Sequence, residues 1–161
     1  MAITHDEALR FAEDVALYFE QDAGLPKMSG RLIGWLLICD PPEQTAGQLA
    51  ESLQASKASI STSTRQLMVA GLIEKVSRPG DRRTYFRIND NGWADSVFER
   101  LAAVTNFLGV LDKGTALMAG DTPARRARLE NVADLYRWMQ RELPPLLARH
   151  RAQRGSTEDG K

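Results

Sequence analysis

Residues 56–88 read SKASISTSTRQLMVAGLIEKVSRPGDRRTYFRI, and this stretch decides the fold. Its first part has helical periodicity, because Ile60 and Leu67 stand one heptad apart and face the same side of a helix. Ser56 is one of the residue types preferred at a helix N-cap, where the side chain accepts a backbone N–H. The pattern therefore predicts a helix over residues 57–70 with one apolar face.

The second part of the stretch predicts a β-hairpin. Gly71 suits the left-handed position that ends a helix, and residues 72–76 and 84–88 are rich in β-branched and aromatic side chains. Between these runs, Pro79 presets the first central dihedral of a type II turn, and Gly80 tolerates the positive φ of the second. We expect two strands joined by a basic turn.

Further helices are expected before this stretch. Thr4 and Thr45 each begin a capping box, with Glu or Gln three residues later, and each box predicts a helix start. A helix over residues 28–39 lies between them and ends before Pro41, because proline disfavours helical geometry in the residue before it. Over residues 28–89 the order is three helices, a strand, a basic turn and a strand, which describes a winged helix-turn-helix.

The C-terminal part has the spacing of long amphipathic helices. Apolar residues recur at steps of three and four over residues 93–111 and again over 129–143, with an interruption at 114–120. Pro144 and Pro145 are expected to break or kink the second helix and to leave only a short helical remainder. The polar residues that follow predict a disordered tail.

These elements predict a mainly α fold class with a small β-hairpin. We expect a winged helix-turn-helix DNA-binding domain over residues 25–90, an N-terminal dimerisation helix over 1–24, C-terminal dimerisation helices over 91–151 and a disordered tail over 152–161. The long flanking helices have more apolar surface than the small central module can cover, and pairing of two chains would bury it. A homodimer is therefore expected, with recognition helices about 34–36 Å apart on a palindromic site in double-stranded DNA.

The chain is neutral overall, with 21 basic and 21 acidic residues, but the charges are unevenly spread. Residues 1–40 contain 3 basic and 7 acidic residues, whereas residues 45–89 contain 7 basic and 3 acidic residues. A local positive surface within a neutral total is enough to attract DNA phosphates. The charge distribution favours DNA binding by the middle of the chain.

The helix over residues 57–70 is the expected recognition helix, whose exposed side enters the major groove. It contains five hydroxyl residues between Ser59 and Thr64, which are mediocre helix formers and poorly explained as an ordinary solvated face. Hydroxyls contact phosphates or base edges, and cations neutralise phosphate or read guanine. The candidate DNA-binding residues on this helix are Lys57, Ser59, Ser61, Thr62 and Arg65.

The hairpin turn is the expected wing. We expect Arg78, Arg82 and Arg83 to contact DNA at the minor groove, with Asp81 orienting a neighbouring arginine. The alternative is a winged-helix protein-interaction module without DNA binding, whose polar face docks another protein. A complex with such a partner that is insensitive to salt would distinguish this alternative from DNA binding.

Residues 24–89 also resemble the GbsR/MarR-type bacterial transcriptional regulators. The resemblance rests on Gly30-Arg31, Gly34, Ser56-Lys57, Ser59-Ile60-Ser61 and Pro79-Gly80-Asp81-Arg82. It implies a dimeric repressor or activator, paired through its N- and C-terminal helices, that responds to a small-molecule effector, choline-like in GbsR. An aromatic cage for such a ligand would draw on Trp35, Trp93, Tyr136 and Trp138, although aromatic residues at helical spacing are more often core residues.

Other functional classes find little support in the sequence. It has no glycine-rich phosphate loop and no histidine-centred nucleophile arrangement, so we expect neither an enzyme nor a cofactor. His5 and His150 lie near opposite ends, and Cys39 is the single cysteine, so we expect no metal site and a structural thiol. No export signal and no apolar run long enough to span a membrane are visible, which predicts a cytoplasmic protein.

Overall fold

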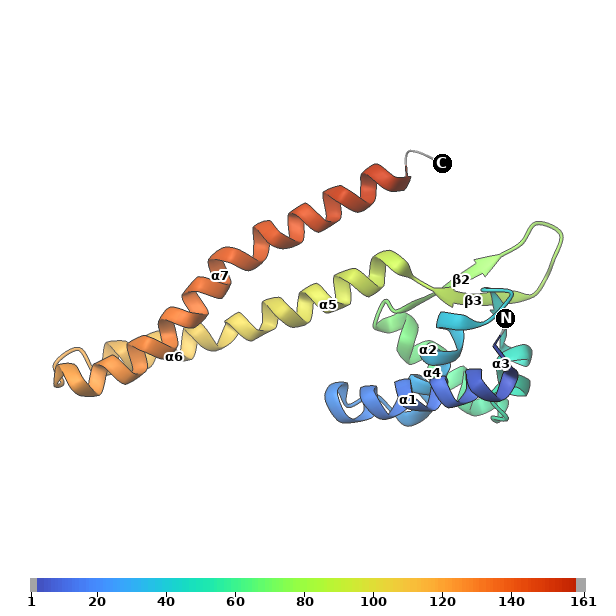
Figure 1. Cartoon of the computed structure of the whole chain (residues 1–161), viewed down its shortest axis with the longest axis horizontal. Helices are drawn as coiled ribbons and strands as arrows, with labels where there is room; N and C mark the ends of the chain where they lie inside the picture. The colour runs from blue at the N-terminus through green and yellow to red at the C-terminus, as the bar shows by residue number, and fades with distance from the viewer. Residues whose placement is uncertain (1–2, 159–161) are drawn as a thin grey trace. The chain divides into compact units, whose positions relative to one another are not determined.

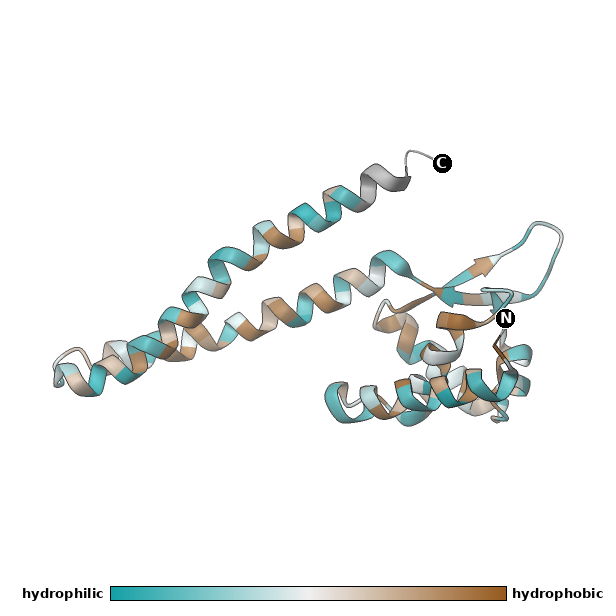
Figure 2. Ribbon diagram, viewed as in Figure 1, coloured by the Kyte–Doolittle hydropathy of each residue, from teal (hydrophilic) through white to brown (hydrophobic). Residues whose placement is uncertain are grey.

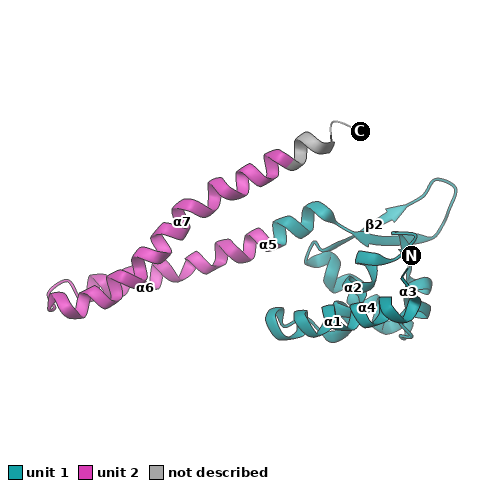
Figure 3. Ribbon diagram, in the orientation of Figure 1, with its two compact units in different colours: residues 1–96 teal, residues 97–161 magenta. Residues whose placement is uncertain are grey.

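The computed structural model describes residues 3–158 and contains two compact units (Figure 1). Unit 1 comprises residues 1–96 and unit 2 comprises residues 97–161, as Figure 3 shows. Helix α5 (Asp90–Val104) begins in unit 1 and ends in unit 2. Each unit has its own buried apolar core.

Unit 1 is a winged helix-turn-helix with an additional N-terminal helix. Its elements are α1 (His5–Ala23), α2 (Lys27–Ile38), β1 (Gln44–Thr45), α3 (Ala46–Ser52), α4 (Lys57–Val69), β2 (Ile73–Ser77) and β3 (Thr84–Ile88). These bounds confirm the predicted order of helices and hairpin. Strand β1 is an addition that the sequence does not predict, because two residues are too few to show an alternating pattern.

Side-chain caps start the helices where the sequence predicts them. The Thr4 hydroxyl accepts from the Glu7 N–H over 3.3 Å, and the Glu7 carboxylate accepts in return from the Thr4 N–H over 2.8 Å. Thr45 starts α3 with the same reciprocal arrangement. Ser56 caps α4 by accepting from the Ser59 N–H over 3.1 Å. All three predicted caps are confirmed.

A three-stranded antiparallel sheet in the order β1-β3-β2 joins the wing to the helices. Ile73 on β2 pairs with Ile88 on β3, and Gln44 on β1 pairs with Phe86 on the other edge of β3. The core between the sheet and the helices includes the fully buried side chains of Leu32, Ile33, Leu49, Leu53, Ile60 and Leu67. Burial of this apolar surface holds α4 and the hairpin in fixed positions on one scaffold.

Helices α1 and α2 approach each other unusually closely. A Cβ added to Gly30 would lie 2.6 Å from Ala16 Cα, and a Cβ added to Gly34 would lie 2.6 Å from Ala12 Cα. Ala12 and Ala16 are fully buried in this contact. Glycines one helical turn apart on α2 therefore let the two backbones meet, and a larger residue would force them apart.

Unit 2 consists of helices packed along one another. After the end of α5 come a 3₁₀ turn, η1 (Thr105–Phe107), and the helices α6 (Leu108–Leu117) and α7 (Pro123–Glu158). Helices α6 and α7 pack around the buried side chains of Leu108, Leu111 and Ala133. This small core is separate from that of unit 1.

Two details of unit 2 differ from the predicted pattern. The helix expected over residues 93–111 is divided by η1, where the Thr105 hydroxyl donates to the Ala102 carbonyl over 2.7 Å and competes with regular helical geometry. The interruption expected at 114–120 begins later, because α6 continues to Leu117.

Helix α7 continues through Pro144 and Pro145, so the predicted alternative of a break is wrong, whereas a kink there stays a prediction. The fixed φ of proline fits a helix, and each proline removes one hydrogen bond to the carbonyl four residues earlier. Those carbonyls belong to Gln140 and Arg141, which are both exposed, so water can satisfy them. The helix therefore tolerates the two prolines at this site.

The C-terminal end also differs from the predicted disordered tail over 152–161. Residues 152–158 belong to α7, which extends to Glu158. Residues 159–161 lie outside the described residues.

Helix α7 has 36 residues and contains both polar and apolar side chains. Figure 2 shows polar and apolar residues interspersed along it. Within residues 3–158, none of the helices has the length and apolar composition needed to cross a membrane.

Candidate nucleic-acid interface

One side of α4 is built into the core of unit 1. Ile60 and Leu67 are fully buried, as their heptad spacing predicts. Ser63 and Thr64 are also buried, and the Thr64 hydroxyl donates to the Ile60 carbonyl over 2.9 Å. Two of the hydroxyl residues on this helix therefore serve internal packing rather than outside contacts.

The opposite side of α4 presents the predicted recognition residues. Lys57, Ser61, Thr62 and Arg65 are exposed, and Ser59 is half-buried. Two further exposed residues of α4, Val69 and Gln66, are not among the candidates predicted from the sequence. Val69 is 86% exposed, and a valine gives no polar signal. Gln66 follows Thr62 by one helical turn, and this spacing indicates that both residues lie on the same side of α4.

The wing turn adopts the type II geometry that Pro79-Gly80 predicts. Gly80 has a φ of 78°, and the Asp81 N–H donates to the Arg78 carbonyl over 3.1 Å, which closes a four-residue turn. The predicted wing residues Arg78, Arg82 and Arg83 are all exposed around this turn. The structure thus brings the three arginines to one end of the hairpin.

Asp81 holds Arg83 beside the turn, which confirms that this acid orients a neighbouring arginine. Arg83 donates from Nε and Nη2 to Asp81 Oδ2 at 3.0 and 2.8 Å, and the Tyr85 hydroxyl donates to the same oxygen over 2.7 Å. The bonds from Arg83, followed by the bond from Tyr85, hold the pKa of Asp81 well below its usual range. The carboxylate therefore stays ionised and fixes Arg83.

A second acid, Glu43, holds the base of the wing. Arg78 donates from Nε and Nη2 to Glu43 Oε2 at 3.1 and 2.9 Å, and Arg87 Nη1 lies 3.4 Å from Glu43 Oε1. The Arg78 guanidinium also lies over the Tyr85 ring, 4.2 Å from its centroid. Arg87 pairs in addition with Glu74 over 2.7 Å. The sequence does not predict this network, because Glu43 and Arg78 are 35 residues apart.

These ion pairs change which positive charges are available. Among the described residues, the basic side chains of residues 45–89 without a hydrogen bond or ion pair are Lys57, Arg65, Lys75 and Arg82. Arg78 and Arg83 are already paired with acids. Of the three wing arginines, Arg82 has the charge that is fully available to an anion.

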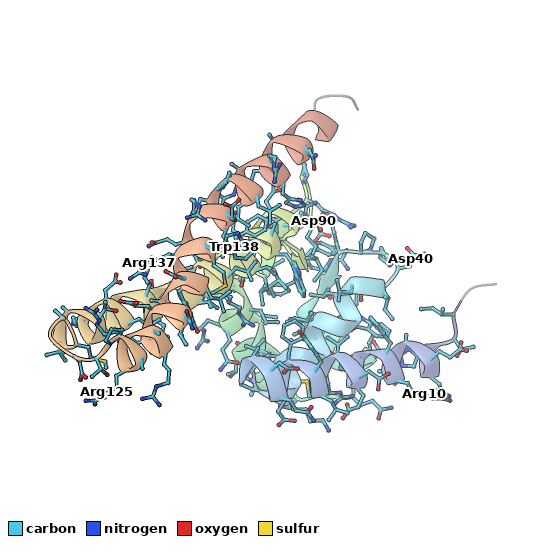
Figure 4. The ribbon with its side chains drawn as sticks, turned by 60° about the vertical axis from the view of Figure 1, so that its left-hand side comes forward. Arg10, Asp40, Asp90, Arg125, Arg137 and Trp138 are labelled. Atoms are coloured by element: carbon cyan, nitrogen blue, oxygen red, sulfur yellow. The ribbon has the colours of Figure 1, made fainter. Side chains whose placement is uncertain are left out.

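The aromatic residues considered for a cage lie in different contacts. Three have separate ring partners: Trp35 with His5, Trp93 with Phe19 and Tyr136 with Phe107. Trp138 is exposed on α7, where Figure 4 labels it beside Arg137. Trp35 and Trp93 belong to unit 1, and Tyr136 and Trp138 belong to unit 2, so a cage that joins them stays a prediction. Among the side chains that the structure describes, those of residues 3–153, no three His, Cys, Asp or Glu residues gather as metal ligands.

Cys39 is half-buried at the end of α2 and is a free thiol. Burial raises the pKa of this thiol to about 11. A thiol that remains protonated at neutral pH is a poor nucleophile, because the thiolate is the reactive form. Burial and protonation both favour the structural role that the sequence predicts.

Comparisons with known proteins identify similar chains. A family model described as "MarR family" matches residues 23–84, and one described as "MmpR5-like MarR family transcriptional regulator" matches residues 91–153. HTH-type transcriptional regulator MmpR5 of Mycobacterium tuberculosis (strain ATCC 25618 / H37Rv) is 37% identical over 153 residues, which cover 95% of this chain and 92% of the relative. A solved structure described as "Crystal Structure of a transcriptional regulator" is 37% identical, covers 90% of this chain and 98% of its own, and has a TM-score of 0.63.

Proposed function

Because this chain belongs to the MarR family of transcriptional regulators, we propose that it binds a palindromic operator as a homodimer, with α4 in the major groove and the wing at the minor groove. The family assignment confirms the MarR resemblance predicted from the sequence. The GbsR branch stays a prediction. A regulator that acts on chromosomal DNA belongs in the cytoplasm, which is part of the proposal.

The observation that supports this reading is the set of unpaired cations on the outside of unit 1. Lys57 and Arg65 on α4 and Arg82 on the wing are exposed and have no acidic partner among the described residues. Ser61 and Thr62 lie between the two α4 cations and are short enough to let a helix dock closely against DNA. Each cation that meets a phosphate releases counterions and contributes to affinity.

Exposed apolar side chains support pairing of two chains. The described part of unit 2 leaves large apolar residues exposed: Val97, Leu101, Val104, Phe107, Val110, Leu117, Val132, Leu135, Trp138 and Leu146. Helix α1 adds Phe11, Leu17 and Tyr18. Apolar surface in such amount is typical of an interface, and a twofold partner would cover it. Two copies would then present two recognition helices to successive major grooves.

A small-molecule effector is also part of the proposal. Unit 2 contains a cavity of about 340 Å³ between α5 and α7, which is large enough for a small ligand. Its lining is mainly apolar, from Phe98, Ala102, Leu143 and Leu147, with Glu99 and Arg151 among the polar residues. We place the effector there, and a thermal shift on adding apolar compounds that is lost in Ala102→Trp would support this placement.

The proposed DNA binding is tested by selecting bound fragments from genomic DNA and titrating the recovered duplex by fluorescence anisotropy at several salt concentrations. Lys57→Ala and Arg65→Ala should weaken binding and each reduce the slope of log affinity against log salt by about 1. Lys113→Ala on α6 removes an exposed cation far along the chain and should leave the slope unchanged. No enriched fragment, together with a salt-insensitive protein complex that Lys57→Ala leaves intact, would instead establish the protein-interaction module.

A further inference from the structure

Glu43 lies in the segment between α2 and β1 and reaches two arginines of the wing. Its side chain is only 18% exposed, whereas those of Arg78 and Arg87 are 46% and 47% exposed. Both Glu43 oxygens are engaged, Oε2 by Arg78 and Oε1 by Arg87. The acid is therefore sheltered from solvent and held by Arg78, which follows β2, and by Arg87 on β3.

Arg78 is fixed from two directions. Nε and Nη2 point at Glu43, and the flat guanidinium covers the Tyr85 ring. Tyr85 is itself buried and donates its hydroxyl to Asp81. Because a guanidinium offers planar donors of fixed geometry, Arg78 cannot turn to a phosphate without losing these contacts.

Pairing of this kind has a consequence for DNA recognition. Phosphates are present in every DNA sequence, so each free cation strengthens non-specific binding as well as binding to the operator. An internal acid that occupies an arginine removes that sequence-independent attraction. Among the described basic side chains of the hairpin, the structure leaves Lys75 and Arg82 free and keeps Arg78, Arg83 and Arg87 paired.

We propose that Glu43 is a specificity-determining residue that withholds Arg78 from DNA phosphates. This inference rests on the proposed function, since it requires that the wing lies against DNA. It also revises the expected role of Arg78, which becomes a positioning residue of the wing. Glu43 thereby limits affinity for unrelated DNA.

The test compares Glu43→Gln with the unchanged chain on two duplexes, the recovered operator and one of unrelated sequence. The variant should bind the unrelated duplex about fivefold more tightly at 0.15 M salt and steepen its salt slope by about 1, as expected for one added phosphate contact. The preference for the operator should fall. Glu51→Gln on α3 removes an equal charge that has no arginine partner among the described residues, and should not change the slope.

Two variants of the exposed arginines keep the test decisive if Glu43→Gln is unstable. Arg78→Gln alone should leave the salt slope unchanged, whereas Arg82→Gln should reduce it by about 1. In the double variant Glu43→Gln/Arg78→Gln, the salt slope should return to that of the unchanged chain, because Arg78 is no longer present to contact a phosphate. A slope that falls equally for Arg78→Gln and Arg82→Gln, or stays unchanged in Glu43→Gln, would overturn the inference.

The proposed function and this inference fail in different ways. If Lys57→Ala and Arg65→Ala leave DNA binding unchanged, the proposed interface itself is wrong. If those variants weaken binding as expected while Glu43→Gln behaves like Glu51→Gln, the interface stands and the role of Glu43 is refuted.

Discussion

Ser29 on α2 donates a hydrogen bond of 2.9 Å from its hydroxyl to Gln66 Oε1 on α4. Ser29 is fully buried, whereas Gln66 lies at the exposed edge of α4. The bond joins the helix proposed to enter the major groove to the helix that supports it. It therefore helps to fix the rotation of α4 about its own axis, which sets the direction of Thr62 and Arg65.

Loss of this bond should lower the stability of the fold. We expect Ser29→Ala to reduce the free energy of unfolding by about 1 kcal/mol, the usual net value of a hydrogen bond. Urea unfolding of Ser29→Ala, Gln66→Ala and the double variant measures the coupling, which should be about 1 kcal/mol. Additive effects would show that the two side chains do not stabilise each other, and Ser61→Ala, which lacks such a partner among the described residues, is the control.

Close packing of α1 on α2 should make Gly34 intolerant of any side chain. A Cβ at Gly34 would lie 2.6 Å from Ala12 Cα, so Gly34→Ala should destabilise the fold by about 1–3 kcal/mol through overpacking. Gly47→Ala is the matched control, because a Cβ there meets only the Thr45 hydroxyl at 3.8 Å. Its stability should be unchanged or raised by up to about 1 kcal/mol. Equal urea midpoints for the two variants would contradict the close approach.

The Asp81 carboxyl should titrate at unusually low pH. The bonds from Arg83 and Tyr85 lower its pKa in the folded state, so their stabilisation is present above the unfolded pKa and is lost as the pH falls through the folded pKa. An NMR titration of the Asp81 Cγ should give a midpoint below the usual 3.8, and Arg83→Gln should move it back toward that value. An unshifted midpoint would mean that the Asp81–Arg83 pair is not maintained in solution.

Cys39 should react slowly with thiol reagents at neutral pH. Its pKa is raised to about 11 by burial, so only a small fraction is thiolate at pH 7–8. The rate of reaction with iodoacetamide should rise with pH until about 11, and unfolding in urea should accelerate it at pH 8. Rapid modification of the folded protein at pH 7 would instead identify a reactive thiol.

The parts of the fold that the sequence predicts depend on interactions within a few residues. The caps at Thr4, Thr45 and Ser56 each join positions three residues apart, and the Pro79-Gly80 turn is set by its own dihedrals. Periodicity likewise identifies the buried side of α4, and with it the exposed candidates for DNA contact. Local chemistry is sufficient in these places because the competing tertiary interactions are few.

The parts that the sequence does not predict depend on residues far apart in the chain. Glu43 and Arg78 are separated by 35 positions, and Ser29 and Gln66 by 37, so no local pattern indicates either pair. The wing arginines accordingly look equivalent in the sequence, although two of them are paired with acids. Pro144 shows the opposite error, because a strong local breaker is tolerated where the residue four positions earlier, Gln140, is exposed.

The proposed pairing of two chains makes a final prediction for α5. Val104 is 46% exposed at the end of this helix, so Val104→Glu should leave the helices intact by circular dichroism while placing a charge in the proposed interface. Because a buried unpaired charge is costly, the variant should sediment as a monomer at micromolar concentration where the unchanged chain sediments as a dimer. Val69→Glu on α4 is the matched control and should remain dimeric, since Val69 lies outside the helices proposed to pair. A monomeric unchanged chain, or a Val104→Glu variant as dimeric as the control, would refute pairing through α5, and the exposed apolar residues of unit 2 would then require a different partner.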